Sequence, residues 1–192
     1  PLGRIISSNG LNQLRIAESE KFPHVTYFFN GGMSVRYEAE DRIEIPSPSV
    51  PTYDQQPEMS ADQLTDVLIN RINTEIYDFI LVNYANPDMV GHTGNLEASI
   101  KAVQTVDRCV DTLITTFLAR GGAVILTADH GNAEELINLD TGEVDTEHSL
   151  NPVPLMILGT KIPPRVLPYG ALKDVAPTVL DLLGVPQPME MT

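Results

Sequence analysis

A short apolar run that ends in an adjacent aspartate and histidine constrains this chain most. Residues 124–128 read VILTA, and Asp129 and His130 follow at once, before a glycine. A continuous apolar run bounded by a turn signal is typical of a strand that is buried on both faces. In open parallel sheets, reactive groups collect just beyond the carboxyl ends of the strands. Asp129 and His130 are therefore candidate site residues, although Asp129 could equally cap a following helix and leave His130 incidental.

The rest of the chain alternates between strand-like and helix-like segments. Apolar or β-branched runs predict strands at 25–29, 77–84, 123–128 and 154–158. Amphipathic spacing predicts four helices: at 4–20, from residue 60, from residue 95, and at 174–183. Ser60 and Gln63 have capping-box spacing at the start of the second helix, and the glycines at 121–122 are expected to end the third. The proline-rich stretch 42–59 is expected to form an extended loop. This order predicts an α/β fold with a mainly parallel sheet and helices on both faces.

The composition narrows the classes of partner and compartment. The 192 residues suffice for one domain with a core, and 26 acidic against 12 basic residues give a formal net charge of −14. Such a charge argues against nucleic acid or an anionic membrane as the main partner, and it suits cations. The sequence has no apolar run of membrane-spanning length and no secretory signal pattern. The single cysteine, Cys109, fits a reducing compartment, so we expect a cytoplasmic protein.

Two predicted strand ends carry groups that can bind a metal ion. Asp88 and His92 follow the strand at 77–84, and Asp129 and His130 follow the strand at 123–128. Asp88 and His92 are four residues apart, so their side chains share one face if that turn is helical. His148 lies in a later loop that is long enough to fold back over the sheet edge. We therefore expect a metal site formed by these five residues rather than a scatter of structural residues.

The number of ligands indicates that such a site is incomplete. Five groups are too many for one tetrahedral zinc ion and too few for two catalytic metal ions. No serine or threonine stands at an evident strand-to-helix turn, where a nucleophile is expected; Ser34, Ser99 and Ser149 are more typical of turn or surface hydroxyls. The chain also begins with the letters PLG, which is unlike a natural start. We therefore expect it to be a fragment of a longer protein.

Four motifs, in this order, resemble those of the cofactor-independent phosphoglycerate mutases. They are RIAESEKFPHVT at 15–26, NYANPDMVGHTG at 83–94, TADHGN at 127–132 and EHS at 147–149. The resemblance covers nearly the whole chain. It implies an alkaline-phosphatase-like α/β fold in which residues 1–192 are the C-terminal part of a metal-binding phosphatase domain, incomplete at its N-terminus. In that family the phosphatase domain is split by an inserted phosphotransferase domain.

The resemblance also implies a role for each candidate ligand. Asp88, His92 and His148 would hold one divalent ion, and Asp129 and His130 would help to hold a second. Mixed carboxylate and imidazole ligands suit Mn²⁺, Co²⁺ or Zn²⁺ better than Mg²⁺, and we favour Mn²⁺, in part because of the family.

Lys21 matches a lysine that, in the family, lies beside the nucleophilic serine and the transferred phosphate. An ammonium group there would stabilise charge on the phosphoryl group; from the local sequence alone, Lys21 resembles a solvated surface residue. The implied reaction is the interconversion of 3-phosphoglycerate and 2-phosphoglycerate in glycolysis, through a phosphoserine, by a monomeric enzyme.

Family residues that this chain lacks limit what it can do alone. The nucleophilic serine and a further metal-binding aspartate lie near the family's N-terminus, and the arginines that hold phosphoglycerate lie mainly in the inserted domain. We therefore expect the isolated chain to be inactive, and to expose an apolar face or sheet edge through which it self-associates or binds the missing part. Two alternatives remain open: a metal-dependent phosphohydrolase of the same superfamily, and a non-catalytic fragment that binds metal or a regulatory partner.

The sequence also suggests roles for four residues outside the five expected ligands. We expect His24 to be a structural histidine that is hydrogen-bonded at the sheet edge, outside the site. Glu134 and Glu135 fit two roles equally well, as acceptors for the ligand histidines or as a solvated helix start. Cys109 is expected to be a small buried hydrophobic residue.

Overall fold

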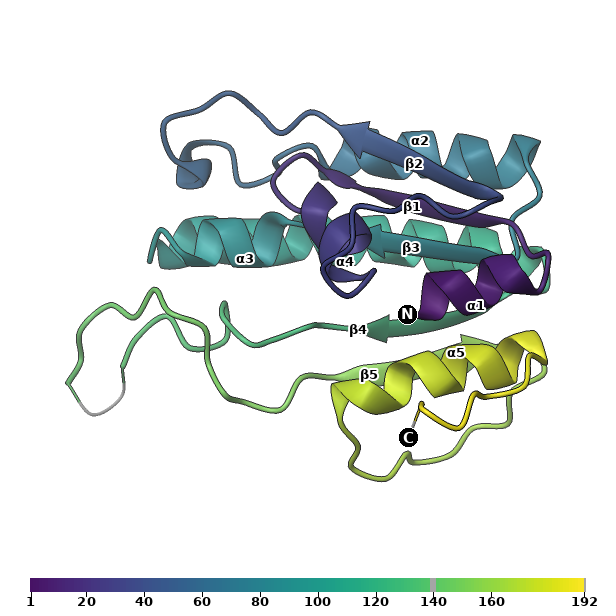
Figure 1. Ribbon diagram of the computed structural model, residues 1–192. Coiled ribbons are helices and arrows are strands. Elements are labelled where there is room, and N and C mark those ends of the chain that lie inside the picture. Colours follow the sequence, from purple (N-terminus) through teal and green to yellow (C-terminus); the bar gives the residue numbers. More distant parts are fainter. Residues whose placement is uncertain (139–140, 192) are drawn as a thin grey trace.

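A three-stranded parallel sheet forms the centre of the molecule (Figure 1). The structure, a computed structural model, describes residues 1–138 and 141–191. Strands β1 (Gln13–Glu18), β2 (Glu40–Ile45) and β3 (Phe79–Asn83) pair in the order β2-β1-β3. Strands β4 (Ala123–Thr127) and β5 (Leu155–Gly159) form a separate antiparallel pair beside β3. The α/β class and the parallel sheet are confirmed, but β5 runs against its neighbour.

Helices cover both faces of the parallel sheet, as predicted. On one face, α2 (Ala61–Thr74) and α4 (Leu96–Ala119) pack on the apolar side chains of β1 through a core that includes Leu14, Ile16, Leu64 and Leu68. On the other face, α1 (Leu2–Ser8) and α5 (Val175–Leu183) pack together around Ile6 and Leu180, against Phe79 of β3. The remaining helices are η1 (His24–Phe28), η2 (Tyr53–Gln55), α3 (Asn86–Gly91) and η3 (Leu172–Asp174). No helix in the described part of the chain is long and apolar enough to cross a bilayer.

The prediction of a helix at 4–20 was wrong over its second half. The helix ends at Ser8, Gly10 adopts a positive φ of 71°, and residues 13–18 form the central strand. The error arose because this strand buries polar side chains. Gln13 and Arg15 are fully buried and bond each other, with Arg15 Nη2 2.7 Å from Gln13 Oε1. A strand with polar residues at alternate positions lacks the apolar run that normally marks a central strand.

The prediction of a strand at 25–29 was also wrong, because this segment forms the π-helix η1. Its β-branched and aromatic residues favour a strand locally, but tertiary contacts hold it in the helix. The buried guanidinium of Arg15 donates to the Val25 carbonyl at 2.8 Å and lies 4.5 Å from the centroid of the Phe29 ring. The chain therefore turns back over the sheet directly after Lys21.

Two smaller expectations also need correction. The stretch 42–59 is not a loop throughout, because its first residues belong to β2. No side-chain capping bond occurs at the start of α2: the Ser60 hydroxyl instead donates to the Pro46 carbonyl at 2.7 Å. Cys109 is buried, as predicted.

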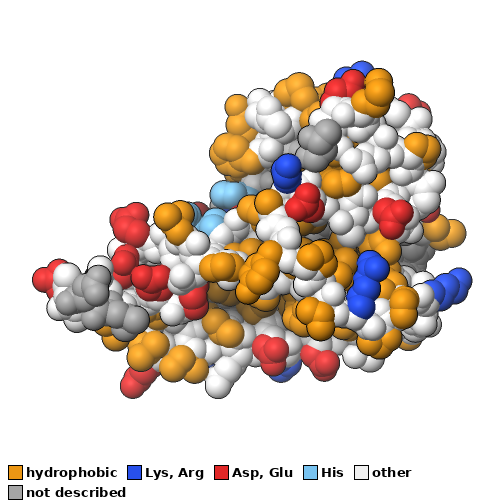
Figure 2. Space-filling model, turned by 90° about the horizontal axis from the view of Figure 1, so that it is seen from below, with side chains coloured by type: hydrophobic (Ala, Val, Ile, Leu, Met, Phe, Trp, Pro, Cys, Tyr) orange, Lys and Arg blue, Asp and Glu red, His pale blue; other side chains and the backbone are white. Residues whose placement is uncertain are grey.

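The β4–β5 pair is less covered than the parallel sheet. Strand β4, predicted to be buried on both faces, is only half-buried. Apolar side chains gather on the face that Figure 2 shows, which is the lower side of the view in Figure 1. Exposed apolar residues in β5 and the segments around α5 are Leu155, Met156, Val166, Tyr169, Leu172 and Leu182. This exposure agrees with the expected apolar face.

Candidate metal centre

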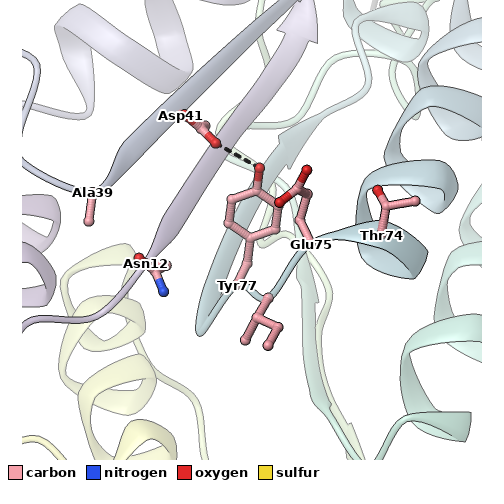
Figure 3. Close-up of a pocket in the computed structure, with 7 residues that line it drawn as sticks. Asn12, Ala39, Asp41, Thr74, Glu75 and Tyr77 are labelled. Atoms are coloured by element: carbon pink, nitrogen blue, oxygen red, sulfur yellow. Dashed lines mark hydrogen bonds between the residues drawn. The ribbon is translucent and has the colours of Figure 1, made fainter.

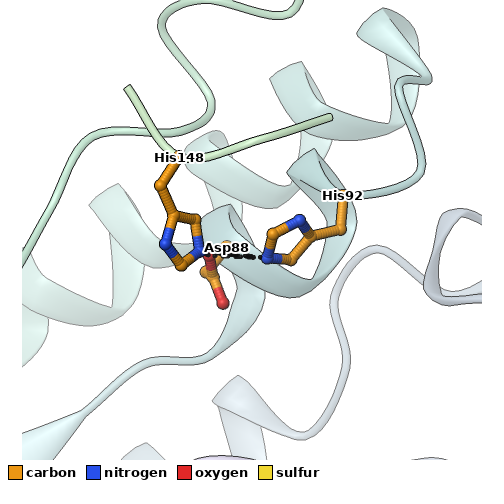
Figure 4. A group of neighbouring side chains, drawn as sticks. All are labelled: Asp88, His92 and His148. Atoms are coloured by element: carbon orange, nitrogen blue, oxygen red, sulfur yellow. Dashed lines mark hydrogen bonds and ion pairs between the residues drawn. The ribbon is translucent and has the colours of Figure 1, made fainter. Parts of the chain in front are cut away.

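The candidate ligands meet at the carboxyl ends of the strands. Strands β1, β2 and β3 are parallel, and β4 points the same way in Figure 1. Helix α3 begins three residues after β3 and carries Asp88, while His92 is its C-cap. Asp129 and His130 follow β4 after one intervening residue, Ala128. The long loop between β4 and β5 brings His148 back onto α3 (Figure 4).

Asp88, His92 and His148 direct one ligand atom each at the same point (Figure 4). Asp88 Oδ1 lies 3.0 Å from His148 Nε2 and 3.2 Å from His92 Nε2, and the two Nε2 atoms are 3.1 Å apart. Two ligands bound at about 2.1 Å to one ion are about 3 Å apart when they meet it at a right angle. The three donors therefore fit a divalent transition metal, which would also relieve the crowding of two imidazole nitrogens.

The orientation of His92 is fixed by its other ring nitrogen. Its Nδ1 lies 2.6 Å from the carbonyl oxygen of Thr146, two residues before His148. A carbonyl can only accept, so Nδ1 carries the proton and Nε2 is left as the free acceptor that a metal needs. This contact also ties α3 to the loop that carries His148.

Lys21 binds the second oxygen of Asp88. Its Nζ forms an ion pair with Asp88 Oδ2, and the two side chains are only 9% and 13% exposed. Burial raises the pKa of Asp88, but hydrogen bonds from Lys21 and Asn132 outweigh it and bring the pKa to about 2. Asp88 is thus a carboxylate at neutral pH, with Oδ1 toward the histidines and Oδ2 toward an ammonium group.

Asp129 and His130 lie beside this cluster rather than in it. His130 Nε2 is 3.7 Å from Asp129 Oδ1 and 3.9 Å from Asp88 Oδ1. The His130 ring stacks on that of His148, with centroids 3.7 Å apart. The alternative that Asp129 caps a helix was wrong, since among the described residues no helix begins between β4 and η3. All five expected ligands share one region, but only three form a tight donor set.

Glu134 joins two segments of the long loop between β4 and β5 instead of accepting from the ligand histidines. It accepts hydrogen bonds from the Asn132 backbone at 2.8 Å, from the Ser149 hydroxyl, and from Asn151 Nδ2 at 3.1 Å. Burial raises the pKa of Glu134, and these bonds bring it to about 2. Gly131 is needed here, because a Cβ on it would meet both Ser149 Oγ and the Glu134 carboxylate. Glu134 therefore helps to fix His148 by binding Ser149, the residue that follows His148 in the sequence.

Asn132 was not singled out from the sequence, and the expectation for His24 needs correction. Asn132 donates from Nδ2 to Asp88 Oδ1 at 2.9 Å; its place two residues after His130 was the available signal. His24 lies in η1, and its buried Nδ1 has no hydrogen-bond partner in the described residues, contrary to our expectation. Burial and the Lys21 ammonium group lower the pKa of His24, whereas the carboxylates of Asp129 and Asp88 raise it.

A pocket lies on another part of the molecule, far from these residues. It has a volume of about 440 Å³ and opens at the amino ends of the strands, among residues that include Asn12, Ala39, Asp41 and Tyr77 (Figure 3). The Tyr77 hydroxyl donates to Asp41 Oδ2 at 2.8 Å. None of the expected site residues lines it.

The chain is similar to known proteins over nearly its whole length. The sequence profile of the Metalloenzyme superfamily matches residues 2–187. Proteins named 2,3-bisphosphoglycerate-independent phosphoglycerate mutase are 56% identical in Desulforudis audaxviator and 53% identical in Thiobacillus denitrificans, over the whole chain. A crystal structure of Leishmania mexicana phosphoglycerate mutase at low cobalt concentration covers 97% of the chain with a TM-score of 0.88 and 34% identity. The chain spans 37% of the length of each of these three proteins.

Proposed function

This chain belongs to the Metalloenzyme superfamily, and we propose that it is the C-terminal part of the metal-binding phosphatase domain of a phosphoglycerate mutase. The whole protein would interconvert 3-phosphoglycerate and 2-phosphoglycerate through a phosphoserine, in the cytoplasm, as part of glycolysis. The observation that carries the proposal is the donor set of Asp88, His92 and His148 with Lys21 on the second oxygen of Asp88. A carboxylate shared between a cation site and an ammonium group suits a phosphate substrate.

We propose two divalent ions, with Mn²⁺ favoured. Asp88, His92 and His148 would hold one, and Asp129 and His130 would contribute to the other; the 56% exposure of the Asp129 side chain leaves room for ligands from elsewhere. Mixed oxygen and nitrogen donors suit Mn²⁺, Co²⁺ and Zn²⁺. When bound, such ions neutralise charge on a transferring phosphoryl group.

Lys21 would supply a further positive charge at the same place. Its ammonium group is anchored on Asp88 Oδ2 at the site edge of β1, in a chain of net charge −14. An anionic substrate needs such local cations to overcome that field. Lys21 would thus help to bind the phosphoryl group and to stabilise its charge in the transition state.

We propose that the nucleophilic serine comes from outside this chain. Among the earlier candidates, Ser149 is engaged by Glu134 and Ser99 is buried in α4, which supports this view. The exposed apolar residues around β5 would then pack against the remaining part of the domain or, in the isolated chain, against a second copy. We expect the whole protein to be monomeric.

An assay on the isolated chain with Mn²⁺ tests this proposal. We expect no interconversion of 3-phosphoglycerate and 2-phosphoglycerate, and no phosphate release from generic phosphate esters. Mutase turnover by the chain alone would contradict an external nucleophile. Release of phosphate would favour the alternative, a phosphohydrolase of the same superfamily. A titration without measurable Mn²⁺ binding would remove the basis for either enzyme.

A further inference from the structure

We propose that Asn132 is a positioning residue that holds Asp88 Oδ1 toward the two histidines, and that Gly91 lacks a side chain so that Asn132 fits. The inference rests on the metal centre of the proposed function, because it concerns how that centre is held in shape. Asn132 lies in the loop after β4 and Asp88 in α3, so one side chain joins the two strand-end motifs that carry the ligands.

The side chain of Asn132 donates its hydrogen bonds to Asp88. The residue is 5% exposed, and its Nδ2 is 2.9 Å from Asp88 Oδ1 and 3.4 Å from the Asp88 carbonyl oxygen. Its Oδ1 is buried and has no hydrogen-bond partner among the described residues. Both facing atoms of Asp88 are acceptors, so only the amide NH₂ group can lie there. The side chain thus leaves its own carbonyl unpaired to keep a donor on the carboxylate.

The bond from Asn132 gives the two carboxylate oxygens of Asp88 different sets of partners. Oδ2 is bound by Lys21, while Oδ1 is approached by Asn132, His92 and His148. A carboxylate held at both oxygens cannot rotate about its terminal bond. Oδ1 therefore stays in line with the histidine nitrogens, and a single oxygen is presented to the metal.

Gly91 supports the same arrangement from α3. A Cβ on Gly91 would contact Asn132 Oδ1 and lie 2.9 Å from Asn132 Cγ, which real Cβ atoms do not tolerate. Gly91 has no positive φ, so the close approach of Asn132 explains this glycine better than backbone conformation does. The pair makes a specific prediction: Gly91→Ala should act on metal binding through Asn132.

Asn86 provides a matched control. Like Asn132, Asn86 is a buried asparagine whose Oδ1 has no hydrogen-bond partner in the described part of the chain. It lies in α3, and its Nδ2 donates to the Pro57 carbonyl at 2.9 Å and not to a ligand. Asn86→Leu and Asn132→Leu should therefore cost similar stability while differing in their effect on the metal.

The experiment is a calorimetric titration of the whole chain and its variants with Mn²⁺, together with the unfolding temperature of each metal-free protein. We expect Asn132→Leu to raise the Kd about 10- to 100-fold, as loss of a ligand's hydrogen-bond partner does, and Asn86→Leu to leave it unchanged. Gly91→Ala should weaken binding similarly, and adding it to Asn132→Leu should cause no further loss. If Asn132→Leu does not fold, Asn132→Ala takes its place.

The possible outcomes distinguish a failure of the metal centre from a failure of the positioning role of Asn132. Wild-type chain that fails to bind Mn²⁺ overturns the metal centre itself, and the role of Asn132 with it. Wild-type binding with an unchanged Kd in the Asn132 variant overturns the positioning role alone. Equal losses of affinity in the Asn132 and Asn86 variants, in step with their unfolding temperatures, would also overturn it, since they would indicate a general structural effect.

Discussion

Replacing Lys21 by methionine should destabilise the metal-free chain by about 2–3 kcal/mol at pH 7. Lys21 and Asp88 are almost fully buried, and removing one partner of a buried pair leaves an uncompensated charge. Breaking a buried ion pair by removing one partner costs about 3–5 kcal/mol of folding free energy. The cost should be smaller here, because Asp88 keeps the hydrogen bond from Asn132. A pKa of about 2 for Asp88, against an ordinary 3.8, corresponds to about 2 kcal/mol, which is the net effect of Lys21, Asn132 and His92 against burial.

The pH dependence follows from the same pKa. Because folding lowers the pKa of Asp88, its contribution to stability is complete above pH 3.8 and is lost as the pH falls toward 2. Without Lys21 the pKa should rise, so the variant should begin to lose stability at a higher pH than the wild type. Urea unfolding between pH 3 and 8, with metal removed by a chelator, measures both effects.

Lys101→Met serves as the control for Lys21→Met. Lys101 pairs with Glu58, but its side chain is 58% exposed. An exposed ion pair contributes about 0–1 kcal/mol. The reasoning would be refuted if Lys21→Met changed the free energy of unfolding no more than Lys101→Met does.

Three further variants test other parts of the account. His148→Ala should abolish tight Mn²⁺ binding in a calorimetric titration; unchanged affinity would exclude His148 as a ligand. Glu18→Gln should be more stable than wild type at pH 8 in urea unfolding, because burial raises the pKa of Glu18 to about 7, so its stabilising protonated form is lost as the pH rises through 7; lower stability would contradict this. Gly131→Ala should weaken Mn²⁺ binding by pushing Ser149 and Glu134 apart, and unchanged binding would show that the loop adapts.

The part of the fold that apolar patterns specify could be predicted from the sequence. Strands β3, β4 and β5 and helices α2, α4 and α5 carry continuous or amphipathic apolar patterns, and each was expected near its observed place. The central strand β1 could not be predicted in this way, because the hydrogen-bond partners of Gln13 and Arg15 are known only once the chain has folded. For the same reason, the β-favouring residues of η1 were misread.

The ligands were predictable for a different reason. Asp88, His92 and Asp129–His130 each follow a strand, and parallel strands bring their carboxyl ends to one edge. The resemblance to phosphoglycerate mutases then suggested Lys21, whose ion pair with Asp88 now supports its place at the site. Asn132 was missed because its role depends on a hydrogen bond to a residue 44 positions away.

A crystal structure of the chain grown with Mn²⁺, with its anomalous scattering, tests the three-ligand metal site directly. We expect an anomalous peak within about 2.5 Å of Asp88 Oδ1, His92 Nε2 and His148 Nε2. A structure grown with Mn²⁺ that places the ion elsewhere, or leaves these three atoms without an anomalous peak, would contradict it.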